Sequence, residues 1–148
     1  PLLSDPDVIR YTGEPPHTTL EAALEVLLTR PIRDYAVHGY GRMACIEKST
    51  GRLIGFSGLK FLEDLQEVDI GYRFLPDYWG KGYATESAKA FIEHAYNELR
   101  IPRIIGLVQP ENTASAIVLQ KIGLLFERKI ILEDCEFELD LYATPRTI

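Results

Sequence analysis

The feature that most constrains the fold is a strand that leads through a glycine-rich turn directly into a helix. Residues 67–74 alternate apolar and polar side chains, which is typical of a strand with one buried face. Residues 75–82 form a turn that contains Gly80 and Gly82. Residues 82–99 then place apolar side chains at helical spacing, which predicts an amphipathic helix. This succession predicts a mixed α/β domain and exposes backbone N–H groups at the start of the helix.

The remaining elements extend the same architecture. A helix is predicted over residues 19–30, ended by Pro31. Further strands are predicted over 35–48, 52–61, 104–108, 124–131 and 136–142, and a short helix begins at Asn112 or Thr113 and ends at Gly123. The first three strands read as an antiparallel meander and the last two as a hairpin. We therefore expect an α/β (α+β-like) fold with a mostly antiparallel sheet flanked by helices, formed by residues 1–148 as one domain.

Composition excludes several classes of function. The formal net charge is −6, with 22 acidic against 16 basic residues, which argues against a nucleic-acid or anionic-membrane partner. The sequence shows no apolar run long enough to span a membrane. Cys45 and Cys135 lie far apart and show no metal-ligand spacing. We expect buried thiols, no metal, and a cytoplasmic location.

The glycine turn is a candidate anion site. Gly80 and Gly82 lack the Cβ atoms that would keep a phosphate away, and the following helix start favours negative charge. A glycine-rich turn without a ligand is the open alternative. A Walker A loop is excluded because no Ser or Thr follows Lys81. The Gly-x-Gly-x-x-Ala match at residues 39–44 precedes a predicted strand rather than the helix that a dinucleotide site needs.

Three regions of the sequence, taken together, resemble a known family. Residues 70–86, which include Trp79-Gly80-Lys81-Gly82-Tyr83-Ala84-Thr85-Glu86, look like motif A of the GNAT superfamily of acetyl-CoA-dependent N-acetyltransferases. Residues 110–115 and 119–124 resemble its motif B, and residues 4–11 resemble the RimJ/RimL-like branch, the ribosomal-protein acetyltransferases. Trp79 departs from the general motif but is frequent in that branch. The resemblance implies the GNAT fold around an acetyl-CoA site, with the family's first strand absent from this chain.

The resemblance also implies site residues. The backbone from Gly80 to Thr85 would hold the pyrophosphate of coenzyme A, and the strand around Tyr72 to Phe74 would pair with the pantetheine arm. Asn112 and Ser115 would face the thiol end of the cofactor. The predicted cofactor-binding residues are thus Tyr72, Phe74, Gly80, Lys81, Gly82, Tyr83, Ala84, Thr85 and Asn112.

The reaction that the resemblance implies needs a proton acceptor for the amine and a donor for the leaving thiolate. Asp69 and Glu67 share one face of the strand that leads to the glycine turn, and either could serve as the base. A solvated strand face is the alternative for both. The family's usual acid, a tyrosine seven residues after Asn112, is replaced by Leu119, so Ser115 is the substitute that the resemblance offers.

These patterns predict an N-acetyltransferase that moves acetyl from acetyl-CoA to a primary amine by direct attack. The acceptor is open between a protein N-terminal amine and a small amine. A non-catalytic acyl-CoA sensor on the same fold is the alternative function. A homodimer is compatible with the resemblance.

Overall fold

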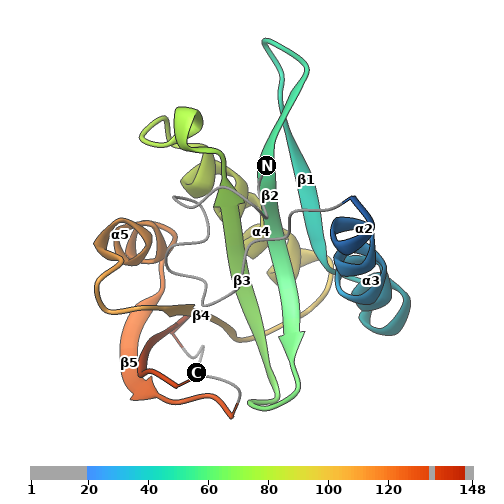
Figure 1. Ribbon diagram of the computed structural model, residues 1–148. Coiled ribbons are helices and arrows are strands. Elements are labelled where there is room, and N and C mark those ends of the chain that lie inside the picture. Colours follow the sequence, from blue (N-terminus) through green and yellow to red (C-terminus); the bar gives the residue numbers. More distant parts are fainter. Residues whose placement is uncertain (1–19, 134–135, 146–148) are drawn as a thin grey trace.

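The computed structural model describes residues 20–133 and 136–145, and the elements below refer to these residues (Figure 1). The helices are α2 (Leu20–Thr29), α3 (Pro31–His38), α4 (Tyr83–Asn97) and α5 (Thr113–Lys121), with a 3₁₀ turn, η1, at Pro76–Tyr78. The strands are β1 (Arg42–Glu47), β2 (Arg52–Leu62), β3 (Glu67–Phe74), β4 (Ile104–Val108), β5 (Leu125–Ile130) and β6 (Leu139–Ala143). In these residues, no helix is long and apolar enough to cross a membrane.

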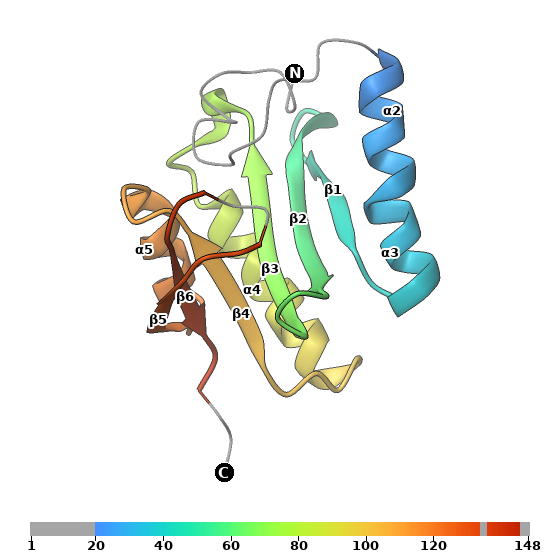
Figure 2. The ribbon, with the colours of Figure 1, turned by 60° about the horizontal axis from the view of Figure 1, so that its bottom comes forward.

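The strands form one sheet in the order β1-β2-β3-β4-β6-β5. Only the β3–β4 pairing is parallel among those described, and the others are antiparallel. This confirms the predicted α/β fold, the meander and the final hairpin. Helix α4 lies behind the sheet, while α2 and α3 lie beside its β1–β2 edge (Figures 1 and 2).

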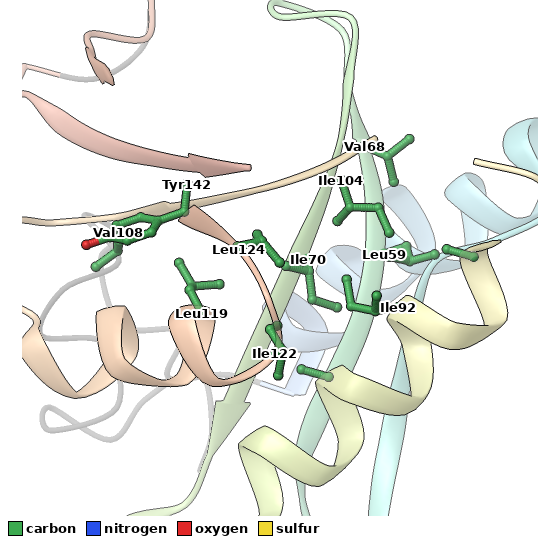
Figure 3. Close-up of a cluster of buried hydrophobic side chains, with 12 residues drawn as sticks. Leu59, Val68, Ile70, Ile92, Ile104, Val108, Leu119, Ile122, Leu124 and Tyr142 are labelled. Carbon is green, nitrogen blue, oxygen red and sulfur yellow. The ribbon is translucent and has the colours of Figure 1, made fainter. Parts of the chain in front are cut away.

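The main core lies between the sheet and helices α4 and α5 (Figure 3). Helix α4 contributes Ala88, Ile92 and Ala95, which are the buried members of its predicted apolar stripe. The core side chains on the strands and α5 include Leu59, Val68, Ile70, Ile104, Val108, Leu119, Ile122, Leu124 and Tyr142. A second cluster around Ile105 and Leu141 covers the opposite face, so β4 is buried on both sides, as its continuous apolar run predicts.

Two predicted strands begin later than expected. Residues 35–38, predicted as strand, belong to helix α3, because Pro31 occupies a first-turn position where its fixed φ favours a helix and its missing N–H costs nothing. Helix α3 ends at Gly39, whose φ of +79° is left-handed. Strand β6 begins at Leu139 rather than at residue 136, so Glu136 and Glu138 lie before it. Cys135 and the motif at residues 4–11 lie outside the described residues. Cys45 is free and only half-buried.

Candidate active site

The glycine loop, residues 75–82, connects the end of β3 to the start of α4. Gly80 and Gly82 adopt left-handed backbone conformations, with φ of +73° and +84°, and open space surrounds the position of a Cβ at each. Gly82 is the N-cap residue of α4, and no side chain of the described residues caps this helix end. The N–H groups of the first turn therefore point out uncapped, as an anion site requires.

Three contacts hold the glycine loop in place. The indole N–H of Trp79 donates to the carbonyl oxygen of Phe74 at 2.8 Å, while half of the Trp79 side chain stays exposed. The Tyr83 hydroxyl donates to the carboxylate of Glu47 at the end of β1. This hydrogen bond lowers the pKa of Glu47 and raises that of Tyr83. The Lys81 ammonium lies over the Tyr78 ring, 5.5 Å from its centroid.

Next to the glycine loop, β3 and β4 separate. Their described pairing consists of Val68 with Ile104 and Asp69 with Ile105, and the strands then diverge toward the loop (Figure 2). We call this diverging part the open end and the paired part, around Glu67, the closed end. At the open end, the backbone groups of residues 70–74 that face β4 have no strand partner among the described residues, so an extended ligand could pair with them.

Asp69 lies where the two strands part. Asp69 is only 7% exposed, and its carboxylate accepts a hydrogen bond from the N–H of Leu107, which lies on β4 beyond the described β3–β4 pairs. Burial raises the pKa of Asp69 to about 6, against the opposing effect of the nearby Arg42. The solvated strand face considered as an alternative is therefore wrong for Asp69.

Arg42 reaches Asp69 by crossing the sheet. It pairs in register with Gly58, which pairs with Gly71, and its guanidinium lies where a Cβ of Gly71 would be. Its Nη2 lies 2.6 Å from Oδ2 of Asp69. Sequence reasoning missed Arg42, although Gly71, which makes room for its side chain, is visible in the sequence.

Glu67 lies at the closed end, away from the glycine loop. Its carboxylate accepts a hydrogen bond from Nε of Arg103 at 2.9 Å, and the same guanidinium donates two hydrogen bonds to Glu127 of β5. Glu67 and Asp69 thus share a strand face, as expected, but bind different cations.

Tyr72, Ser115 and Asn112 are brought together at the open end. The Tyr72 hydroxyl donates to the carbonyl oxygen of Ser115 at 3.0 Å and lies 3.0 Å from its Oγ. Burial raises the pKa of Tyr72 to about 12. The Asn112 side chain caps α5 by accepting the N–H of Ser115 at 3.2 Å. Leu119 is buried against Gly106 of β4, which gives the leucine a packing role.

A cavity of about 200 Å³ lies between α2–α3 and the end of β2. It is lined by Thr29, Arg30, Arg33, Asp34, His38, Lys60, Phe61, Leu62, Glu63, Asp64 and Leu132. Lys60 is the register partner of Asp69 and Leu62 that of Glu67, so the cavity lies on the closed-end side of the sheet and reaches the position opposite Asp69. Within the described residues, no group of three or more potential metal ligands was found.

Comparison with known proteins agrees with this geometry. A family model described as "Acetyltransferase (GNAT) domain" matches residues 1–125. An uncharacterised N-acetyltransferase of Bacillus licheniformis is 31% identical over 135 residues, which cover 90% of this chain and 74% of that protein. The crystal structure of a GNAT-family acetyltransferase from Bacillus anthracis matches with a TM-score of 0.77 at 29% identity, over 95% of this chain and 82% of that one.

Two more distant structures share the fold. A spermidine N-acetyltransferase from Vibrio cholerae, solved in complex with CoA and spermine, has a TM-score of 0.75 at 15% identity and covers 96% of this chain and 84% of its own. A ribosomal-protein-S5-alanine acetyltransferase from Vibrio fischeri has a TM-score of 0.72 at 19% identity, with coverage of 95% and 84%.

Proposed function

The chain belongs to the GNAT acetyltransferase family and is an acetyl-CoA-dependent acetyltransferase, and from this premise we propose that it acetylates a primary amine by direct attack. The observation that carries the proposal is the open end of the sheet, which lies beside an uncapped, glycine-flanked helix start. The catalytic reading is favoured over the acyl-CoA sensor because the matched relative of Bacillus licheniformis is itself named an N-acetyltransferase.

The residues at the open end fit acetyl-CoA. We propose that the backbone from Gly80 to Thr85 holds the pyrophosphate, because the space beside both glycines is open. The unpaired backbone edge of Tyr72 to Phe74 would bind the pantetheine arm, and Asn112 fixes the start of α5 beside it. Bound there, acetyl-CoA supplies an activated acetyl thioester.

We propose Asp69 as the group that accepts the proton of the amine. Its pKa of about 6 leaves it ionised at neutral pH, yet makes it a stronger base than an exposed aspartate. Glu67, the other candidate, is bound to Arg103 at the closed end, and this contact favours a structural role for it. Ser115, whose Oγ lies beside the Tyr72 hydroxyl, stays the proposed donor to the leaving sulfur.

The acceptor would reach Asp69 from the side of the cavity, past Lys60. The similar structures include enzymes named for spermidine and for a ribosomal-protein alanine, so both a small polyamine and a protein N-terminus stay open as acceptors. The RimJ/RimL-like branch, a cytoplasmic location, a homodimer and the extent of the domain over residues 1–148 also stay proposals.

Calorimetric titration with acetyl-CoA, followed by thiol release with a panel of amines, tests this function. We expect micromolar binding, roughly −8 kcal/mol, and release of coenzyme A that depends on an added amine. Binding without thiol release for any amine, including spermidine and an alanine-initiated peptide, would favour the sensor. Absence of binding would contradict the assignment of the open end.

A further inference from the structure

Lys60 connects the cavity to Asp69. It lies opposite Asp69 in the register of β2 and β3, so the two side chains leave the same face of the sheet. Lys60 also lines the cavity between α2–α3 and the end of β2. Any amine that reaches Asp69 through this cavity must therefore pass the side chain of Lys60, which itself carries a primary amine.

The surroundings of Lys60 make its ammonium easier to deprotonate than that of an exposed lysine. The side chain is half-buried, and within the described residues its Nζ makes no hydrogen bond or ion pair. Burial lowers the pKa of Lys60, and the charges of Arg42 and Arg30 act in the same direction against those of Asp34 and Asp69.

Lys129 is the opposite case among the described lysines. Its ammonium lies 2.6 Å from Asp140, and this hydrogen bond raises its pKa. An ammonium held by a carboxylate must leave its partner before it can react, whereas Lys60 has no such partner among the described residues. Lys60 thus combines a position opposite Asp69 with an amine that is not held in an ion pair in this part of the chain.

From this placement we propose that Lys60 is itself an acceptor of the acetyl group, so that the enzyme acetylates its own chain at this position. The inference rests on the proposed function, because acetyl-CoA is the co-reactant. The neutral Nζ attacks the thioester carbonyl carbon and forms the C–N bond of an amide. The C–S bond breaks, the sulfur leaves with the electron pair and is protonated, and the proton lost by the nitrogen passes to Asp69 or to water.

Acetylation of Lys60 would change the site. The acetylated side chain carries no charge and is longer, and it stays in the wall of the cavity. Self-acetylation should therefore compete with an external amine and should slow its reaction as the modified chain accumulates.

The test is to incubate the folded chain with isotope-labelled acetyl-CoA, without added amine, and to measure the label at each lysine by peptide mass spectrometry. We expect Lys60 to be labelled at least about tenfold faster than Lys89, an exposed lysine on α4, because Lys60 lies opposite Asp69 in the cavity wall and Lys89 does not. The chain unfolded in urea should lose this difference. Lys60→Arg should abolish label in that peptide and keep acetyl-CoA binding.

A second measurement on the same preparation separates this inference from the function beneath it. If acetyl-CoA binds and external amines are acetylated, but Lys60 is labelled no faster than Lys89, self-acetylation is overturned and the proposed function stands. Equal labelling of Lys60 in the folded and unfolded chains would show simple chemical acetylation and would also overturn it. Absence of both acetyl-CoA binding and amine turnover would overturn the inference together with its premise.

Discussion

The closed and open ends of the β3–β4 pair satisfy their polar groups in different ways. At the closed end, main-chain pairing continues and Arg103 ties Glu67 to Glu127, so every group involved has a partner within the fold. At the open end, side chains replace the missing strand: Asp69 accepts the N–H of Leu107.

The difference between the two ends shows which part of β3 can take part in ligand binding and catalysis. At the closed end the charged side chains are paired within the fold, whereas the open end, among the described residues, leaves backbone groups of β3 without a strand partner and keeps a buried carboxylate beside them. Two acidic residues spaced two apart are equivalent in the sequence, and only the path of the neighbouring strand distinguishes them.

The largest expected effect comes from exchanging the two carboxylates for amides, one at a time. Asp69→Asn should lower the turnover number by about 10²–10⁴-fold, because an amide cannot accept the proton of the amine. Its acetyl-CoA affinity should change little. Thiol-release kinetics and calorimetric titration measure the two quantities.

Glu67→Gln is the matched variant at the closed end. It should keep turnover within about twofold and should lower the free energy of unfolding by about 1.5–3 kcal/mol, because the hydrogen bond to Arg103 loses its charge. If Glu67→Gln abolished turnover while Asp69→Asn kept it, the assignment of the base would have to be reversed.

The second effect tests the glycine loop at the open end. Gly82→Val should weaken acetyl-CoA binding by about a hundredfold, or about 2.7 kcal/mol, because the side chain would fill the space left for an anion. The left-handed φ of Gly82 adds roughly 1–2 kcal/mol of instability.

Gly123→Val supplies the control for that strain. Gly123 also has a positive φ and open space at its Cβ, but it follows the far end of α5. We expect a similar loss of stability, measured by urea unfolding, with acetyl-CoA affinity retained. Equal losses of affinity in both variants would mean that strain, and not the anion site, explains the effect.

The sequence predicts the elements on either side of the open end well. The bounds of β3 and β4 agree with the predicted ranges 67–74 and 104–108, because alternation and a continuous apolar run each favour one structure. The strand prediction for residues 35–38 fails because Pro31 starts a helix, and this outweighs the β propensity of their side chains.

The site is less predictable than the fold. The glycine loop is visible in the sequence because its residues are contiguous. The surroundings of Asp69 are not, since Arg42 comes from β1 and the N–H of Leu107 from β4, and only the sheet topology brings them together. Lys60 became apparent only through its register with Asp69.

The third effect is the dependence of the rate on pH. Because the pKa of Asp69 is about 6, kcat/KM should rise with pH and level off above that value, falling about tenfold per unit below it. Arg42→Met removes the cation that favours the ionised form and should move the midpoint upward by about one unit, or about 1.4 kcal/mol. Arg128→Met, at an exposed position of β5, should leave the profile unchanged.

Asp69 also makes the stability of the fold depend on pH. Whereas kcat/KM should rise with pH, the contribution of Asp69 to the free energy of unfolding should fall. The folded chain holds the Asp69 proton more tightly than the unfolded chain, whose ordinary pKa is 3.8. This contribution to stability is complete below pH 3.8 and is lost as the pH rises through about 6. Urea unfolding of the wild type and of Asp69→Asn across this range should show the loss in the wild type alone.

The smallest expected effect concerns the contact that holds α5 to the open end. Tyr72→Phe removes the hydrogen bond to Ser115 and should cost about 1 kcal/mol of stability. The effect on turnover of either Tyr72→Phe or Ser115→Ala should stay below about tenfold, because a thiolate with a pKa of about 8.5 leaves with little assistance. The double variant should lose little more than either single variant, since the two hydroxyls form one hydrogen-bonded unit. Independent, multiplying losses would instead mean that Ser115 donates its proton without Tyr72, and the open end would then hold two separate functional groups where we infer one.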